Sequence, residues 1–364
     1  MFIEGNLPTL QRMKSLRYGI IGTGTMGREH LRCVEIVDGA EVVAVADPYP
    51  DSLNAAREIH ADLQLYDDYR RMLEKETLDA VVVATPNDTH ADIVCDVLES
   101  DVHLLAEKPV ATTLEDSNRI VEAEARSNRI LQVGLELRHA PIYVRMRELI
   151  DEGRIGRVRQ LWCKEFRGPW AFKVDHWITQ RSRSGGTLVE KNCHHFDLFN
   201  WFAGERPARV AGFGSCDLVY GKDHFGIEPD VLDNAQVVVQ YENGAVATQM
   251  DCLYCTGLAE LEVGVIGTEG WLIASTGGQD LLRIFRRGVA EEETEEFIIP
   301  VDIRNTSHDG SVYYEHLSFA DSIRNELSPT PDIEAGWWGT VVGLAAEQAV
   351  RESRIVEIND FTDP

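Results

Sequence analysis

The sequence predicts an α/β protein of two domains: a doubly wound parallel sheet, then an α+β domain built on a large, mostly antiparallel open sheet. Three observations lead to this fold class. The 364 residues exceed what one hydrophobic core usually holds. From Leu16, short apolar runs alternate with amphipathic stretches, whereas beyond Arg138 strand-like runs follow one another with few helical signals between them. We place the domains at 1–136 and 137–364.

The first domain contains five short apolar runs that we expect to be parallel strands. They are Tyr18–Ile21, Val42–Ala46, Ala80–Ala84, His103–Ala106 and Ile130–Val133. Helical stretches connect them; over 88–100, for example, apolar residues recur at spacings of three and four, and Asp88 or Thr89 is the expected N-cap. Strands joined by helices in this way are typical of a doubly wound domain.

In the second domain a helix over 141–152 precedes a series of strands. The expected strands are Val158–Phe166, Val210–Asp217, Ala235–Tyr241, Ala245–Leu253, Leu258–Ile266 and Trp271–Ala274. Glycines separate the later strands, which is typical of an antiparallel sheet. We expect a solvated loop over 290–296, where five of the seven residues are glutamate. Two helices close the chain, the second over 334–353, and they could pack back on the first domain.

The composition restricts the class of protein and its partners. Hydrophobic residues at 44% and charged residues at 26% are typical of a soluble globular protein. The formal charge of −26 repels phosphate backbones and anionic membranes, so we expect neither nucleic acid nor a membrane as partner. Seven scattered cysteines do not form a disulfide framework, no segment has the length of a membrane span, and residues 1–17 lack a signal peptide's apolar stretch. We therefore expect a cytoplasmic protein.

A dinucleotide site is predicted where the first strand ends. This strand runs directly into a G-x-G-x-x-G turn made of Gly22, Thr23, Gly24, Thr25, Met26 and Gly27. The glycines allow a tight turn, close approach of a pyrophosphate and helix–strand packing, and the helix N-terminus offers free N–H groups. Asp47 ends the next strand, where a carboxylate can accept both ribose hydroxyls and repel a 2′-phosphate. No basic residue occurs in 48–50, so this Rossmann domain is expected to bind NAD rather than NADP.

Three further segments, together with the glycine turn, carry a family resemblance. The third strand leads into ATPNDTH (84–90), the fourth into EKP (107–109), and GGTLVEKNCHHFD occupies 185–197. Together they resemble the glucose-fructose oxidoreductase/inositol dehydrogenase/MocA family over nearly the whole chain. The resemblance implies a nicotinamide-dependent oxidoreductase acting on a sugar, cyclitol or related polyol. It also implies that the second domain binds substrate and forms a homo-oligomer, a dimer or tetramer, through its sheet.

Three residues of these motifs are candidates for catalysis. Lys108 follows the fourth strand at the ligand-binding edge of the sheet, and the resemblance implies that it hydrogen-bonds the reacting hydroxyl. His194 is the candidate general base because imidazole titrates near neutral pH. Glu190 lies four residues earlier and could orient the ring if this stretch is helical. The family usually has aspartate at position 190 and glycine at Asn192, so Glu190 could instead reach substrate; Lys191 is a further departure without an explanation.

The remaining site residues are expected from the resemblance. The residues implied at the cofactor, besides Lys108, are Thr85, Pro86, Asn87, His90 and Glu107, with a structural role equally open for His90. Those implied at the substrate are Arg138 and Asp197, besides Lys108, Glu190 and His194; a salt bridge is an equal alternative for Arg138. Trp177 precedes the Gly185-Gly186 segment, and from that place it could form a wall of the substrate pocket. No metal site is expected, because adjacent histidines such as His194 and His195 converge poorly on one ion.

The sequence thus predicts an NAD-dependent enzyme that oxidises a secondary hydroxyl of a sugar, cyclitol or related polyol to a ketone, or catalyses the reverse. Hydride would pass to the nicotinamide while His194 takes the proton, Lys108 polarises the oxygen and Glu190 orients His194. Two alternatives stay open. One is an NAD-retaining lyase or glycosidase that acts through a transient keto-sugar, and the other is a non-catalytic NAD-binding redox regulator.

Overall fold

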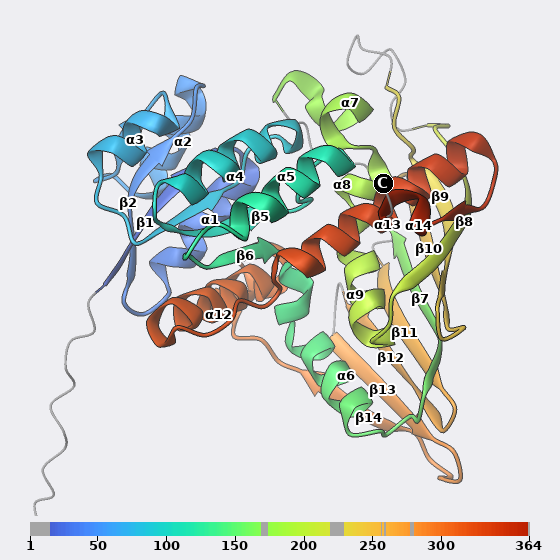
Figure 1. The fold of residues 1–364 in the computed structure, drawn as a ribbon. Coiled ribbons are helices and arrows are strands. Elements are labelled where there is room, and N and C mark those ends of the chain that lie inside the picture. The colour runs from blue at the N-terminus through green and yellow to red at the C-terminus, as the bar shows by residue number, and fades with distance from the viewer. Residues whose placement is uncertain are drawn as a thin grey trace, which may run out of the picture.

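The computed structural model describes residues 15–168, 174–218, 229–255, 257, 260–276 and 280–362, which form two sheets and the helices around them (Figure 1). The predicted fold class is confirmed: a parallel sheet comes first and a larger, mostly antiparallel sheet second. Residues 1–14, which make up most of the segment considered for a signal peptide, and residues 258–259 of one predicted strand lie outside the described parts. Within those parts, no helix combines the length and the apolar character that crossing a membrane requires.

The first sheet has six parallel strands in the order β3-β2-β1-β4-β5-β6. Their bounds are β1 Leu16–Ile21, β2 Ala40–Ala46, β3 Gln64–Tyr66, β4 Ala80–Val83, β5 His103–Glu107 and β6 Leu131–Gly134. Five of them were predicted. β3 was not, because its three residues are exposed or half-buried and form no long apolar run. The strand order reverses at β1, and ligands bind open α/β sheets at such a switch point.

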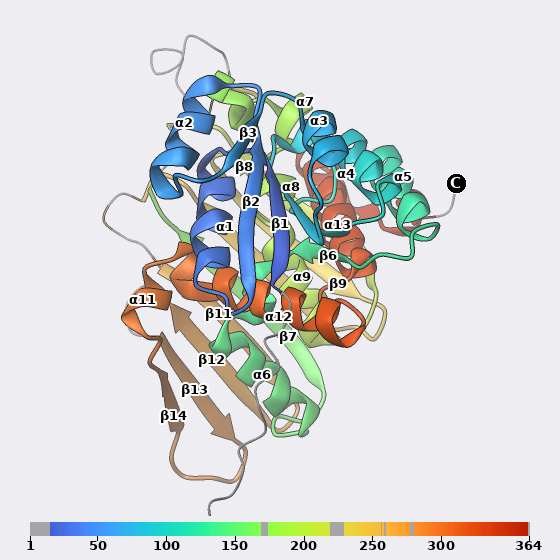
Figure 2. The same cartoon turned by 90° about the vertical axis from the view of Figure 1, so that its left-hand side faces the viewer.

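Helices cover both faces of this sheet. They are α1 Thr25–Glu35, α2 Pro50–Ile59, α3 Tyr69–Lys75, α4 His90–Glu99 and α5 Leu114–Glu124. Figure 2 shows α1 and α2 on one side of the strands and α3, α4 and α5 on the other. Thr89, one of the two expected N-cap residues, is the N-cap of α4; a 3-10 turn, Asn87–Thr89, precedes the helix, and the Thr89 hydroxyl donates to the Pro86 carbonyl and not to an N–H of the helix.

The second sheet has nine strands in the order β14-β13-β12-β11-β7-β10-β9-β8-β15, with β7 and β10 as its parallel pair. The bounds are β7 Val158–Phe166, β8 Pro207–Ser215, β9 Asn234–Tyr241, β10 Val246–Cys252, β11 Glu260–Gly267, β12 Gly270–Thr276, β13 Asp280–Arg286, β14 Glu293–Phe297 and β15 Val356–Glu357. The helices α6 Pro141–Asp151 and α9 Cys193–Ala203 pack on it, and Phe196 and Phe199 of α9 are part of the core.

The expectation of a loop over 290–296 is wrong for most of that segment, because β14 begins at Glu293 and forms the edge of the second sheet. Its glutamates lie toward solvent and meet arginines: Arg145 Nε lies 3.0 Å from Glu295 Oε2, and Arg154 Nη2 lies 3.3 Å from Glu293 Oε2. Charged side chains are common on edge strands, where they discourage pairing with another chain. A run of glutamates therefore did not exclude a strand.

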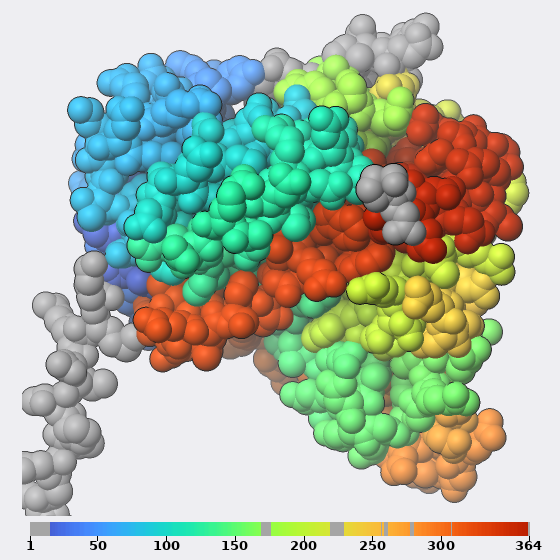
Figure 3. All heavy atoms as spheres, in the orientation of Figure 1, coloured from blue at the N-terminus to red at the C-terminus, as the bar shows by residue number. Residues whose placement is uncertain are grey.

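The two closing helices join the domains. In α12 (Ser311–Asn325), Phe319 and Ala320 belong to the same core cluster as Tyr18 and Ile20 of β1. The longer α13 (Ile333–Glu352) contacts α5 and β6 of the first domain as well as α9 and β8 of the second. In Figure 3 these helices, orange to red, form a band between the blue-to-teal first domain and the yellow-green second domain. This packing fixes the position of the first sheet relative to the second domain.

Candidate functional site

The glycine turn stands at the switch point, between the end of β1 and α1. Gly22 has φ +89°, in the left-handed region, and a Cβ at Gly27 would lie 1.8 Å from the Gly22 carbonyl oxygen. These two glycines are therefore required by the fold itself. A Cβ at Gly24 would meet no atom within 4 Å. Its space lies open before the N-terminus of α1, where the N–H groups favour an anion.

Gly24→Ala and Gly27→Ala are expected to separate binding from folding. Gly24→Ala should keep the melting temperature of the protein but weaken NAD(H) binding roughly tenfold, because its methyl group occupies the space left for the pyrophosphate. Gly27→Ala should destabilise the fold by about 1–3 kcal/mol, because the new methyl group collides with backbone. Thermal unfolding and a fluorescence titration with NADH measure both effects. Equal melting temperatures for the two variants would contradict this assignment.

A cleft of about 580 Å³ runs along the carboxyl ends of the first sheet's strands, and it has the size of a small-molecule site. It brings together most of the expected cofactor residues and two of the expected catalytic ones. Those that line it are Gly22, Gly24, Thr25, Met26, Asp47, Thr85, Pro86, Asn87, Glu107, Lys108, Trp177 and Glu190. The expected site residues that do not line it are Thr23, Gly27, His90, Arg138, His194 and Asp197.

Asp47 faces this cleft and is bound to the turn. Its Oδ2 accepts from the Thr23 backbone N–H at 2.7 Å and from the Thr23 hydroxyl at 3.2 Å, and its Oδ1 accepts from the Tyr49 N–H at 2.9 Å. The carboxylate is thus held in one orientation at the end of β2. Oδ1 keeps a further lone pair for a hydroxyl donor in the cleft, whereas Oδ2 already accepts two hydrogen bonds.

His90, for which a cofactor role and a structural role were equally open, does not line the cleft. Its Nδ1 lies 2.8 Å from the Pro109 carbonyl oxygen and its Nε2 lies 3.0 Å from the Thr85 carbonyl oxygen. The buried ring therefore ties the loop after β4 to the segment that carries Lys108. Burial lowers its pKa more than the contacts with the two carbonyl oxygens raise it. Of the two roles left open from the sequence, the geometry supports the structural one.

Lys108 and Glu190 meet at the wall of the cleft. Lys108 Nζ donates to the Glu190 carbonyl oxygen at 2.8 Å and lies 3.3 Å from Glu190 Oε1, and both side chains are nearly buried. Burial by itself lowers the pKa of Lys108, but the negative charge of Glu190 and of the nearby Glu107 more than offsets it, so the pKa is raised. Lys108 is accordingly a fixed ammonium group at the cleft wall. The Lys108–Pro109 peptide bond is cis.

The expected pairing of Glu190 with His194 is not what the structure shows. α8 (Thr187–Glu190) ends at Glu190 and α9 begins at Cys193, so no continuous helix joins the two residues, and Glu190 instead contacts Lys108. The carboxylate beside His194 belongs to Glu136, whose Oε2 lies 3.3 Å from His194 Nδ1. Burial, with the charge of Lys108 as the next cause, lowers the pKa of His194 well below its usual value. The ring is therefore neutral near pH 7.

Sequence reasoning missed Glu136. It follows β6 by two residues, at the same edge of the sheet as Asp47 and Lys108. That position is a signal which could have identified it, since polar residues just past parallel strands meet at one edge.

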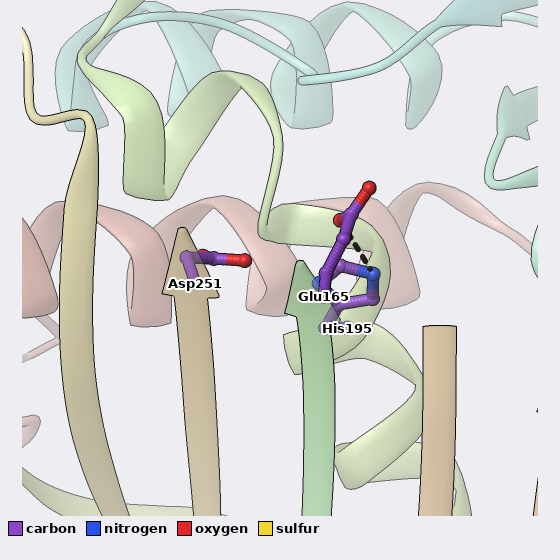
Figure 4. Close-up of side chains that lie close together, drawn as sticks. All are labelled: Glu165, His195 and Asp251. Carbon is purple, nitrogen blue, oxygen red and sulfur yellow. Dashed lines mark ion pairs between the residues drawn. The ribbon is translucent and has the colours of Figure 1, made fainter. Parts of the chain in front are cut away.

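His195 points to a second buried cluster, formed with Glu165 of β7 and Asp251 of β10 (Figure 4). Glu165 and Asp251 are partners in the register of the two parallel strands, and one donor atom from each of the three residues lies within 4.8 Å of the other two. Such a set of donors could hold a cation. However, Lys191 Nζ lies 3.2 Å from Glu165 Oε1, so the cluster already contains a positive charge. This contact also accounts for Lys191, which the sequence left unexplained.

Asp251→Asn is expected to change how stability depends on pH. Burial, followed by the charge of Glu165, raises the pKa of Asp251 to about 8, far above that of an unfolded aspartate. The unfolded state therefore releases a proton that the folded state keeps, and stability falls as pH rises from about 4 to 8. Asn resembles the neutral acid, so the variant should gain on the order of 2 kcal/mol relative to wild type between pH 5 and 8.

Urea unfolding at pH 5 and pH 8 measures this difference. The exposed Asp51→Asn is the control and should leave the pH dependence unchanged. If Asp251→Asn and wild type lose the same stability over this range, Asp251 is ionised in the folded protein and the expectation fails.

Arg138 and Asp197, both expected at the substrate, bind each other instead. Arg138 Nε and Nη2 donate to the two Asp197 oxygens at 2.7 and 2.6 Å, and the Asp197 side chain is 1% exposed. The guanidinium carbon also lies 5.3 Å from the Trp201 ring centre. The salt bridge, left open as an alternative for Arg138, is the arrangement found. Trp177, in contrast, lines the cleft as expected.

Two family models match the chain. Residues 16–135 match the Gfo/Idh/MocA model described as "Oxidoreductase family, NAD-binding Rossmann fold", and residues 147–358 match its "C-terminal alpha/beta domain". The chain belongs to this oxidoreductase family. Its Gfo/Idh/MocA relatives include the inositol 2-dehydrogenase of Salmonella typhimurium, which is 30% identical over 96% of this chain and 99% of the relative.

Two further comparisons are with a relative and with a solved structure. The scyllo-inositol 2-dehydrogenase (NAD+) of Bacillus subtilis is 27% identical over 94% of this chain and 96% of the relative. The solved structure of a levoglucosan dehydrogenase in complex with NADH superposes with a TM-score of 0.82, covering 95% of this chain and 99% of the other. At 20% identity, that likeness concerns the fold alone. By the family model, residues 16–135, which carry the glycine turn, are an NAD-binding Rossmann domain.

Proposed function

We propose that this Gfo/Idh/MocA member is an NAD-dependent dehydrogenase that interconverts a secondary hydroxyl and a ketone on a cyclitol, sugar or related polyol. The observation that carries the proposal is the shared cleft, where Lys108 and Glu190 lie in the same 580 Å³ space as the glycine turn and Asp47. The inositol dehydrogenases among its relatives support a cyclitol as the substrate class.

The cleft fits NAD. The open space at Gly24 suits a pyrophosphate, and the Asp47 carboxylate, already oriented by Thr23 and Tyr49, suits a ribose with free hydroxyls. A 2′-phosphate would meet that carboxylate, which favours NAD over NADP. When bound, NAD supplies the hydride acceptor. The residues Thr85, Pro86, Asn87 and Glu107 line the part of the cleft between Gly24 and Lys108.

The side chains then have distinct roles. Lys108 Nζ donates a hydrogen bond to the reacting oxygen and stabilises the negative charge that develops on it. Glu190 holds Lys108 and accepts from a neighbouring substrate hydroxyl, while Trp177 forms part of the wall. His194 does not line the cleft in the chain without ligand, and as the base it would accept the hydroxyl proton at Nε2, the ring nitrogen opposite the one that faces Glu136, once bound substrate brings that proton within hydrogen-bond reach.

Nicotinamide absorbance with a panel of inositols, sugars and keto-sugars tests the proposal. We expect reduction of NAD by at least one cyclitol or sugar, and tighter binding of NAD(H) than of NADP(H). Product without net NADH would instead identify the lyase or glycosidase alternative. Binding of NAD without turnover on any member of the panel would favour the redox regulator.

A homo-oligomer through the second sheet is part of the proposal. On its β8 and β9 strands the apolar side chains Phe213 and Val238 are 80% and 41% exposed in the isolated chain. Light scattering after size exclusion is expected to give a dimer or tetramer, which Phe213→Glu should dissociate. A monomer in wild type would contradict this part of the proposal.

A further inference from the structure

His194, the proposed base, has little contact with solvent. Its side chain is 2% exposed, and it does not line the cleft in which the cofactor would bind. With cofactor and substrate in place, water in that cleft would be displaced. A proton accepted by His194 therefore needs a route that does not pass through the cleft.

Glu136 provides a connection, because two imidazole rings share its carboxylate. Its Oε2 lies 3.3 Å from His194 Nδ1, and its Oε1 lies 3.4 Å from His308 Nε2. These are close approaches and not hydrogen bonds, and His194 Nδ1 and Glu136 Oε1 are buried without a hydrogen-bond partner among the described residues. The Glu136 side chain is 3% exposed, whereas that of His308 is 34% exposed. The three residues come from three separate segments, the 3-10 turn Glu136–His139 after β6, α9 and the 3-10 turn Ser307–Gly310 before α12.

His308 also borders a second cavity, of about 90 Å³, which is large enough for water. Besides apolar side chains, its lining includes Asp280, Asp309 and Ser311. No residue of this lining belongs to the cofactor cleft. A proton that reaches His308 therefore arrives at a cavity large enough for water. Because this cavity shares no lining residue with the cofactor cleft, it stays open when the cleft is filled.

We propose that Glu136 and His308 carry the proton from His194 to this second cavity, which makes them proton-relay residues for the reaction; the inference rests on the proposed dehydrogenase function. In the oxidation direction, His194 Nε2 takes the hydroxyl proton as hydride leaves for the nicotinamide. His194 Nδ1–H passes to Glu136 Oε2, the acid proton on Oε1 passes to His308 Nε2, and His308 Nδ1–H passes to water. One proton leaves, and each of the three groups returns to its neutral form.

The electrostatic surroundings agree with this geometry. Burial, together with the charge of Glu107, raises the pKa of Glu136 to about 8, so the acid form is present near neutral pH. Partial burial and the positive charges of Lys191 and Lys108 lower the pKa of His308, so its ring is neutral near pH 7. The titratable groups that act on Glu136 from the surrounding elements are Glu107, Lys108, Lys191, Cys193, His194, His308 and Glu315.

Chemical rescue tests the relay. His308→Ala should lower kcat about tenfold at neutral pH and leave the Kd for NADH unchanged, and added imidazole should restore the rate because it can enter the space of the deleted ring. In Glu136→Gln, whose amide cannot pass a proton between the rings, the rate should fall and imidazole should have no effect. The control is His60→Ala, at a half-buried histidine that lines neither cavity; it should be insensitive to imidazole, as should wild type.

A second measurement separates failure of the relay from failure of the proposed function. Infrared difference spectra of the resting protein between pH 6 and 9 should show a protonated carboxyl band that Glu136→Gln removes and His308→Ala shifts, with or without turnover. Absence of that band, or a His308→Ala variant as active as wild type, would overturn the relay. Absence of turnover in wild type with the band present would overturn the proposed substrate class and leave the connection from Glu136 to His308 standing.

Discussion

Lys108→Met is expected to lower kcat for a turned-over polyol by about 10²–10⁴-fold, the range typical of a positioned catalytic group. Methionine keeps most of the volume of the lysine side chain and removes its charge and donors. The lysine is held at the cleft wall by two contacts with Glu190, at 2.8 and 3.3 Å, so its ammonium group is oriented before substrate arrives. Binding of NADH should change by no more than about threefold, because the cofactor's phosphates bind at the glycine turn.

Steady-state kinetics and an NADH titration measure both quantities. Lys75→Met, on the exposed face of α3, is the matched control and should behave as wild type. Because Lys108→Met also leaves the Glu190 carboxylate without its partner, the double variant Lys108→Met/Glu190→Gln separates charge imbalance from loss of the donor. If the double variant regains wild-type kcat, Lys108 acts by neutralising Glu190 and not on the substrate.

The sheet edge explains why so much of the cleft could be predicted. In a parallel sheet every strand delivers its following loop to the same edge, so the glycine turn, Asp47, Thr85 and Lys108 were placed together without any knowledge of side-chain contacts. Periodicity was sufficient for this step, because each strand was buried and apolar. The short β3 and the glutamate-rich β14 lack that pattern and were missed.

Pairings between side chains of distant segments could not be predicted in the same way. Glu190 and His194 have helical spacing, yet the break between α8 and α9 separates them, and Glu136 from a different part of the chain takes the place beside His194. His308 reaches the same carboxylate from a turn more than a hundred residues away from His194 in sequence. Helical spacing in the sequence therefore did not predict which carboxylate lies beside His194.

Arg138→Leu is expected to destabilise the protein by about 3–5 kcal/mol, because it leaves a buried charge without its partner. Asp197 is 1% exposed and receives both of its charge-assisted hydrogen bonds of 2.6–2.7 Å from Arg138. The loss should be larger at pH 8 than at pH 5. Burial raises the pKa of Asp197, and Arg138 lowers it by a smaller amount. Without the arginine the pKa rises further, so the folded state keeps a proton that the unfolded state releases as pH rises.

The double variant Arg138→Leu/Asp197→Leu distinguishes this structural role from substrate binding. Replacing both members of a buried ion pair with apolar residues is often close to neutral for stability, so much of the loss should be recovered. If the pair only supports the fold, the double variant should also regain kcat/KM, since neither residue lines the cleft. Urea unfolding and steady-state kinetics on the two single variants and the double variant complete the cycle. A stable double variant with KM raised more than about tenfold would return Arg138 or Asp197 to the substrate site, as the family resemblance implied.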